Sequence, residues 1–147
     1  MTPAFVLPWL AISDMPTPSD VPALREAGIT HVVDLSGRSD GITGLEHGFH
    51  AMYLPTTDPG VKSLAYWWAG IAFALGASAE GRVLVHCWAG SNRSPRMAQA
   101  ILMVALSLDF ESAEHIVRTA RPSAAMDGYA EDVAVAVKHW RLATGMG

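Results

Sequence analysis

Residues 82–94 read RVLVHCWAGSNRS, and this stretch decides both the fold and the candidate site. Its apolar run, Val83-Leu84-Val85, is typical of a buried strand, and the segment from Ser94 onward has the apolar spacing of a helix. Between them lies a loop that begins at Cys87, the single cysteine of the chain, and reaches Arg93 six residues later. A strand, a tight loop and a helix N-terminus in this order place a thiol where it can meet a bound tetrahedral oxyanion.

Length and composition predict one globular domain over residues 1–147. Half of the 147 residues are hydrophobic and 16% are charged, which excludes a disordered chain. The net charge is -4 without a basic run, so we expect no nucleic-acid partner. The uncharged stretch 63–79 is just short of a membrane span and predicts a buried core helix. With no positive signal-peptide region at the N-terminus, we expect a cytoplasmic monomer without a membrane partner.

Hydrophobic periodicity and turn residues predict alternating strands and helices. Glycines and prolines separate most of the segments, and Ser36–Gly48, with four glycines, is expected to be a loop. The order of elements implies a central sheet with helices on both faces. The predicted strands are 6–7, 10–12, 29–35, 50–54 and 82–86, and the predicted helices are 21–27, 63–79, 94–106, 110–120 and 127–143.

The loop from Cys87 to Arg93 has the residues that an anion site requires. Successive N–H groups that turn inward bind phosphate or sulfate, and the N-terminus of the following helix adds positive potential. Gly90 allows a backbone conformation with positive φ, and the planar fork of Arg93 can grip two anion oxygens. This positive field favours the thiolate of Cys87. A thiolate against a bound phosphate is an in-line nucleophile that yields a phosphocysteine intermediate.

This chemistry needs an acid that protonates the leaving oxygen. Asp58 is the candidate, because it follows the predicted strand 50–54 and loops after strand ends gather at one edge of an α/β sheet. Asp58 would then act as a base on water. Asp34, in a strand, and Asp40, in a glycine-rich loop, are the rivals, and ordinary turn chemistry is the other explanation of Asp58. Ser94 could donate a hydrogen bond to the sulfur and stabilise it as a leaving group.

Other side chains near the loop have more than one explanation. His86 beside Cys87 is poor zinc spacing, and the chain has no cysteine pair, so neither a metal nor another cofactor is expected. Trp88 either forms a wall that stacks on an aromatic substrate or packs within the loop. Arg96 either faces solvent or extends the positive field of the site. On the predicted helix 110–120, Glu111, Glu114 and His115 are expected to be exposed.

The pattern His86-Cys87-x-x-Gly90-x-x-Arg93-Ser94 resembles the signature of cysteine-dependent protein phosphatases. The flanking segments resemble the small dual-specificity branch over nearly the whole chain. They are GITHVVDL at 28–35, Tyr53-Leu54-Pro55 ahead of Asp58, GRVLV at 81–85 and RTARP at 118–122. The resemblance implies an α/β three-layer sandwich, in which a central, mostly parallel sheet of four to five strands is flanked by helices on both faces.

The resemblance also implies a metal-free phosphomonoesterase and a role for each matching residue. Cys87 would be the nucleophile, Asp58 the general acid and Arg93 the phosphate binder, while His86 would order the loop and support the thiolate form of Cys87. The phosphate cradle would be formed by the amides of Trp88, Ala89, Gly90, Ser91, Asn92 and Arg93. Asn92 stands where a serine is common. The chain also lacks the tyrosine-containing loop of strict tyrosine phosphatases, which argues against exclusive phosphotyrosine specificity.

Two functions remain at this point. The first is an enzyme that hydrolyses phosphotyrosine, and phosphoserine or phosphothreonine, in a phosphorylated protein or a small phosphomonoester. The second is a phosphate-binding pseudophosphatase module. The uncharged loop residues Trp88, Ala89, Ser91 and Asn92 favour singly phosphorylated groups over polyphosphorylated lipids or RNA 5′ ends.

Overall fold

The structure is a computed structural model that describes residues 2–38, 40–54 and 62–145. A five-stranded sheet with the order β1-β2-β5-β3-β4 forms its centre. The edge strand β1 (Ala4–Leu7) pairs antiparallel with β2 (Leu10–Ser13), and all other pairs are parallel. The remaining strands are β3 (Ile29–Asp34), β4 (His50–Tyr53) and β5 (Arg82–His86). The predicted mostly parallel sheet is confirmed.

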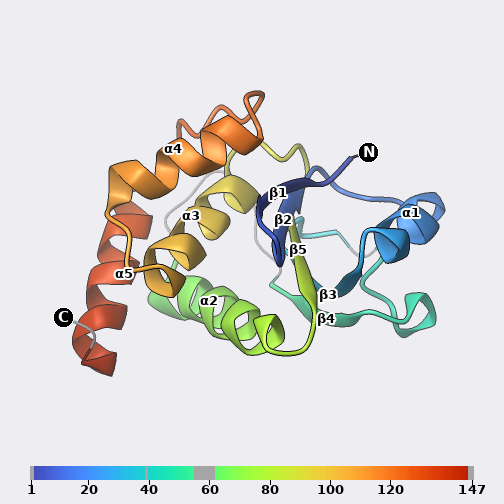
Figure 1. Cartoon of the computed structure of the whole chain (residues 1–147), viewed down its shortest axis with the longest axis horizontal. Coiled ribbons are helices and arrows are strands. Elements are labelled where there is room, and N and C mark those ends of the chain that lie inside the picture. Colours follow the sequence, from blue (N-terminus) through green and yellow to red (C-terminus); the bar gives the residue numbers. More distant parts are fainter. Residues whose placement is uncertain (1, 39, 55–61, 146–147) are drawn as a thin grey trace.

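Helices cover both faces of the sheet, as the order of elements predicts (Figure 1). The short helix α1 (Val21–Glu26) lies on one face, near the 3-10 turns Pro18–Asp20 and Leu45–His47. On the other face, α2 (Leu64–Ser78), α3 (Arg93–Ala105) and α4 (Phe110–Ala120) pack against strands, and α5 (Ala130–Thr144) packs outside them on α2 and α3. The α/β three-layer architecture is therefore confirmed.

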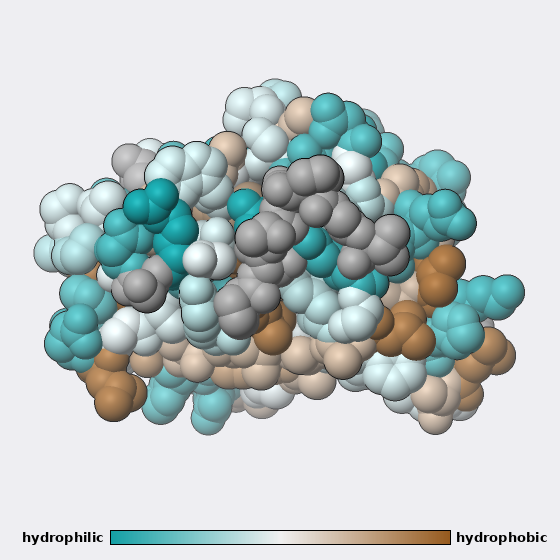
Figure 2. Space-filling view, turned by 180° about the vertical axis from the view of Figure 1, so that it is seen from behind, coloured by the Kyte–Doolittle hydropathy of each residue, from teal (hydrophilic) through white to brown (hydrophobic). Residues whose placement is uncertain are grey.

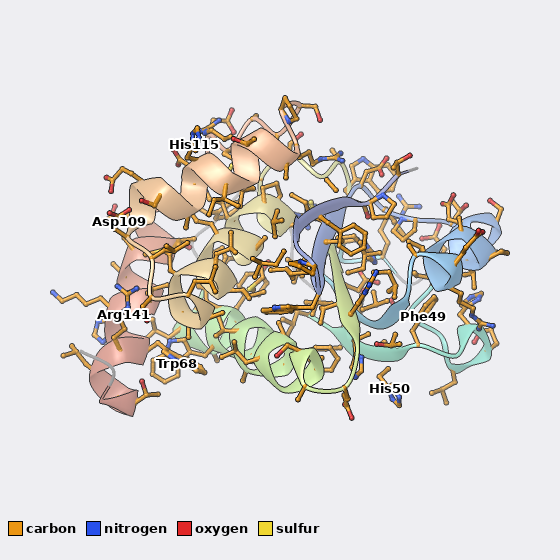
Figure 3. The ribbon with its side chains drawn as sticks, in the orientation of Figure 1. Phe49, His50, Trp68, Asp109, His115 and Arg141 are labelled. Carbon is orange, nitrogen blue, oxygen red and sulfur yellow. The ribbon has the colours of Figure 1, made fainter. Side chains whose placement is uncertain are left out.

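Alternate side chains of each inner strand serve two hydrophobic clusters, one on each face of the sheet. In β5, Val83 and Val85 belong to the larger cluster under α2–α5, while Leu84 belongs to the smaller cluster near α1. Phe49 also belongs to the smaller cluster, and Figure 3 places it on the α1 side of the sheet. Because neighbouring residues of a strand point to opposite faces, the apolar run of β5 fills both cores at once.

The central helix α3 is buried on all sides, whereas its sequence suggests one apolar face. Every residue from Arg93 to Val104 is buried, including Arg96 and Gln99. Pro95 lies in the first turn, where a missing N–H costs no helical hydrogen bond. The helix packs against the sheet and also against α2, α4 and α5. Its N-terminus is thereby fixed beneath the loop that precedes it.

The uncharged helix α2 is partly buried rather than wholly enclosed. Tyr66, Trp67 and Ile71 face the core, and Trp68 reaches toward α5, where its Nε1 donates to the carbonyl of Ala136 at 3.0 Å (Figure 3). The outer side exposes small apolar residues such as Ala72, and Figure 2 shows pale-brown apolar surface along the lower edge of the molecule. Across the described ranges, no helix combines the length and apolarity needed to cross a membrane.

The last helix begins later than the sequence pattern suggests. The prediction places its start at residue 127, whereas α5 starts at Ala130. Tyr129 has a φ of 63°, in the left-handed region, so it cannot continue a right-handed helix toward its N-terminus. Met126 has a φ of 50° and also departs from helical geometry. The segment before α5 is therefore an ordered loop, and it lies against the candidate site.

Candidate active site

The carboxyl ends of three neighbouring strands meet where the Cys87 loop begins. His86, the last residue of β5, is in register with Ser13 of β2 and with Asp34 of β3. The backbone N–H of Leu35 donates to the carbonyl of His86 at 2.8 Å, which fixes the start of the loop. Loops that follow parallel strands collect at this edge, so the topology explains why the site lies here.

The carbonyl groups of the loop all have hydrogen-bond donors on the outside of its curve. Three donors are backbone N–H groups from other segments or the following helix, and one donor is an arginine side chain. The pairs are Met15 N to Trp88 O at 2.9 Å, Arg121 Nε to Gly90 O at 3.0 Å and Nη2 to Ala89 O at 3.4 Å, Met126 N to Ser91 O at 3.0 Å, and Arg96 N to Asn92 O at 2.9 Å.

This outward arrangement of the carbonyls leaves the amides for a ligand. Within the described ranges, no protein acceptor pairs with the backbone N–H groups of residues 88–92. A run of such amides in a curved loop is the geometry that binds an oxyanion. The carbonyl bonds hold the peptide planes in place without any ligand.

Gly90 is required by both its conformation and its surroundings. Its φ is 69°, which non-glycine residues adopt at a cost. A Cβ at this position would lie 2.6 Å from Nη2 of Arg121 and 2.9 Å from the backbone nitrogen of Asp14. The glycine therefore allows the loop to approach both neighbouring segments closely.

Cys87 lies at the floor of the loop, with 2% of its surface exposed. Its Sγ is 3.3 Å from Oγ of Ser94, and the Ser94 hydroxyl is also 3.3 Å from the carbonyl of Ser13. The predicted contact between Ser94 and the sulfur is therefore present. The residue is also a member of the larger hydrophobic cluster, so among the described residues the sulfur lies between the core and the loop.

His86 is fully buried beneath the loop. Its Nδ1 lies 3.3 Å from the carbonyl of Cys87, and its Nε2 lies 3.7 Å from Oδ1 of Asp34. Burial lowers the pKa of His86 below its usual value of 6.5, although Asp34, the Cys87 carbonyl and Asp14 oppose the shift. A neutral imidazole can order the loop by hydrogen bonding but adds no positive charge beside the thiol.

Arg93 is the first residue of α3 and has 6% of its surface exposed. Its Nη1 donates to the carbonyl of Leu35 at 2.8 Å. This contact ties the loop to the end of β3 and restricts the guanidinium to the edge of the sheet at which Cys87 lies. The hydrogen bond to Leu35 restrains the long side chain. A restrained, planar guanidinium is suited to bind two oxygens of a phosphate group at once.

Three aspartates were considered as the general acid, and the structure describes the surroundings of two of them. Asp58 lies outside the described residues. Asp34 is fully buried, and its carboxylate accepts from the backbone N–H and hydroxyl of Ser36 and from the hydroxyl of Thr43. Asp40 is exposed and forms a two-point pair with Arg38, which lowers the pKa of the Asp40 carboxyl. Both rivals therefore already have structural roles.

Trp88 projects from the loop with 52% of its surface exposed. The guanidinium carbon of Arg38 lies 4.5 Å from the centre of the indole ring. Its backbone supports the loop while its ring stands half-exposed at the surface, against Arg38. Whether the ring contacts a substrate stays a prediction.

Arg96 was expected either at the surface or in the field of the site; the surface position is wrong, and its contribution to the field stays a prediction. It is 3% exposed and donates to the carbonyls of Met126 and Gly128 and to the carboxylate of Glu114. The prediction that Glu114 is exposed is also wrong, because only 25% of this side chain is exposed and it pairs with Arg96 at 2.6 Å. Gly128 N in turn donates to Oδ1 of Asn92 at 3.0 Å, so the segment before α5 supports the loop.

Sequence reasoning gave no role to Arg121 or to the segment that includes Met126. Both hold loop carbonyls, and Arg121 belongs to the RTARP stretch on which the resemblance rests. For the burial of Arg96, a signal was available in the sequence. Gln99 lies three residues after Arg96 on a helix otherwise rich in apolar residues, which indicates a buried polar pair. Among the described residues, no three His, Cys, Asp or Glu side chains gather to hold a metal ion.

The loop geometry and the fold define the class of cysteine-loop phosphatases, and comparison with known proteins specifies the family. The sequence model described as "Dual specificity phosphatase, catalytic domain" matches residues 12–132. The chain belongs to this dual-specificity phosphatase family of the protein tyrosine phosphatase superfamily.

Curated relatives and solved structures agree with this assignment. Dual specificity protein phosphatase 12 of Mus musculus is 41% identical over 105 residues, which are 69% of this chain and 31% of that protein. The protein of the same name from Homo sapiens is 37% identical over 109 residues, which are 71% and 32% of the two chains. The chain thus spans about a third of the length of these relatives.

Similar folds occur in solved structures at low sequence identity. The crystal structure of PTPMT1 has a TM-score of 0.87 at 20% identity and covers 99% of this chain and 100% of its own. The structure of Tk-PTP in the active form has a TM-score of 0.78 at 22% identity, with 93% and 94% of the two chains covered. These likenesses confirm the fold.

Proposed function

We propose that this protein is a metal-independent cysteine phosphatase that hydrolyses phosphomonoesters through a phosphocysteine intermediate. The observation that carries the proposal is the loop from Trp88 to Asn92, whose carbonyls are bonded outward while its amides have no acceptor in the described part of the chain. The sulfur of Cys87 lies at its floor. Preorganised donors around a buried nucleophile stabilise charge where it develops in phosphoryl transfer.

In the first step, the Cys87 thiolate attacks phosphorus as the bond from phosphorus to the ester oxygen breaks. The loop amides and the guanidinium of Arg93 hold the equatorial oxygens, and the leaving oxygen takes a proton from Asp58. The products are the free alcohol and phosphocysteine. In the second step, Asp58 takes a proton from water as the water oxygen attacks phosphorus. The P–S bond breaks, inorganic phosphate leaves and the thiolate returns, with Ser94 donating to the departing sulfur.

We further propose that the substrate is a singly phosphorylated group, phosphotyrosine above all and phosphoserine or phosphothreonine in addition. The uncharged residues Trp88, Ala89, Ser91 and Asn92 support this substrate class. A thiolate nucleophile works only while reduced, which fits the reducing conditions of the cytoplasm.

The test is hydrolysis of para-nitrophenyl phosphate in the presence of a chelator. Wild type should turn over, Cys87→Ser should be inactive, and Asp58→Ala should lose about 100-fold or more in kcat, which is the usual loss on removal of a general acid. Activity retained in Cys87→Ser would end the proposal. Phosphate binding without turnover by wild type would leave the pseudophosphatase module instead, and an unchanged rate in Asp58→Ala would assign the acid to another group.

A further inference from the structure

A recess of about 540 Å³ opens directly beside the loop, and we call it the Trp88 recess. Trp88 and Ala89 form one side, residues 14–17 after β2 form another, and Arg38 and Asp40 after β3 complete the lining. Because two of the lining residues belong to the proposed cradle, a peptide held there by its phosphate has its neighbouring residues at the mouth of this recess.

The positive charge in the lining is already engaged. Nε and Nη2 of Arg38 donate to the two carboxylate oxygens of Asp40 at 3.2 and 3.1 Å. The guanidinium also lies against the Trp88 ring, 4.5 Å from its centre. An anionic group entering the recess would therefore have to displace Asp40 before it could use Arg38.

Asp14 is the acidic residue of the described lining whose carboxylate is not paired with an arginine. In the described ranges, its carboxylate has neither an ion-pair nor a hydrogen-bond partner, although the residue is partly buried. Its position is near the loop, because Met15, the next residue, donates its N–H to the carbonyl of Trp88. With Arg38 and Asp40 neutralising each other, the described residues of the lining carry one net negative charge, that of Asp14.

We propose that the Trp88 recess binds the side chain of a lysine or arginine next to the phosphorylated residue of a peptide substrate. Asp14 would pair with the cation, and the exposed indole of Trp88 would contact it. The guanidinium carbon of Arg38 already lies 4.5 Å from the centre of this ring, so the incoming cation would compete with Arg38 for the indole. The inference rests on the proposed function, since the phosphate in the cradle positions the peptide.

The experiment uses fluorescent phosphotyrosine peptides that differ only in the two flanking residues, which are Arg, Ala or Glu. Binding is measured by anisotropy with Cys87→Ser, and kcat/KM is measured with wild type. We expect the Arg peptide to bind about three- to tenfold more tightly than the Ala peptide, the range of one partly exposed ion pair with a cation–π contact. The Glu peptide should bind more weakly than both.

The matched variants are Asp14→Asn and Glu111→Gln, each added to Cys87→Ser. Asp14→Asn should reduce the ratio between Arg and Ala peptides to about one, whereas Glu111→Gln, an exposed carboxylate on α4, should leave it unchanged. High salt should also reduce the ratio between the Arg and Ala peptides when Asp14 is present. This measurement tests the role of the Asp14 charge without changing that residue.

The outcomes separate the two proposals. Equal binding of the Arg and Ala peptides, or preference for the Glu peptide, overturns the basic-residue subsite, and the latter would mean that Arg38 reads an acidic neighbour. Preference for the Arg peptide without phosphate release by wild type retains the subsite and ends the proposed catalysis. Failure of all three phosphopeptides to bind overturns the subsite, and hydrolysis of para-nitrophenyl phosphate by wild type then decides the proposed catalysis separately.

Discussion

Replacement of Arg121 by methionine tests whether the outer hydrogen bonds hold the loop in its anion-binding shape. The change keeps much of the side-chain length but removes the bonds to Gly90 O at 3.0 Å and Ala89 O at 3.4 Å. A hydrogen bond from a charged donor contributes about 1.5–3 kcal/mol, and the longer contact adds little. We therefore expect Arg121→Met to lower the free energy of unfolding by about 2 kcal/mol, measured by urea denaturation.

The functional readout is the affinity for inorganic phosphate, measured by competitive inhibition or calorimetry. Freed carbonyls allow the peptide planes of Ala89 and Gly90 to rotate, so phosphate affinity should fall by about tenfold or more, which is about 1.4 kcal/mol. Arg82→Met is the matched control, because Arg82 Nη1 donates to the carbonyl of Ala27 at 2.9 Å and lies at the opposite end of β5. Arg82→Met should lower stability while keeping phosphate affinity. Unchanged phosphate affinity in Arg121→Met would refute the reasoning.

Three further predictions follow from the same contacts. Gly90→Ala should lower stability by about 1–2 kcal/mol from left-handed strain alone, seen by urea denaturation, and should weaken phosphate binding; a variant with wild-type values would contradict the assigned conformation. Since burial lowers the folded-state pKa of His86 below 6.5, the unfolded chain takes up that proton first, so stability should fall as pH drops below about 6.5. His86→Gln should flatten this slope relative to wild type, and the exposed control His115→Gln should not. Glu114→Gln should destabilise the protein by weakening its pair with Arg96, and this loss should shrink as the pH falls below 4.5, because the wild-type carboxyl, whose pKa is lowered on folding, then loses its charge as well; a loss that does not shrink in acid would contradict the charge pairing.

Two opposing effects decide whether the pKa of Glu114 is raised or lowered on folding. Burial alone would raise the pKa of this carboxyl, but the hydrogen bonds and charges of Arg96 and Arg118 outweigh it and lower the pKa below the usual 4.5. A carboxyl with a lowered folded-state pKa stabilises the protein above its unfolded pKa and loses that contribution as the pH falls. The stabilising effect is therefore fully present at neutral pH.

The sheet and most helices could be predicted because local patterns and tertiary structure agree. The continuous apolar run of β5, which is buried on both faces, and the turn residues between elements report directly on backbone geometry and burial. The start of α5 could not be predicted, since the left-handed Tyr129 is an ordinary residue type whose conformation depends on the loop before it. The helix propensities of the neighbouring residues therefore do not predict the left-handed conformation of Tyr129.

The centre of the site was predictable, whereas its supports were not. Cys87, Gly90 and Ser94 occur within one short motif, and the structure brings them together around one loop. Arg96 and Arg121 act on carbonyls that are distant in sequence, up to 32 residues away, and arginine is a common surface residue. Only the folded chain reveals that these charges are used for backbone hydrogen bonds.

The central claim is that Cys87 receives the phosphoryl group within the loop, and the most direct measurement is detection of that adduct. Asp58→Ala removes the acid of the first step and the base of the second, but para-nitrophenolate is a good leaving group that depends little on the acid, so the second step is slowed more and the adduct should accumulate. The variant is mixed with para-nitrophenyl phosphate, quenched rapidly in acid and digested for mass spectrometry. The account predicts one added phosphoryl group on the peptide that contains Cys87, and none in Cys87→Ser. Phosphate release with the Cys87 peptide unmodified at every quench time, or an adduct on another residue, would contradict it.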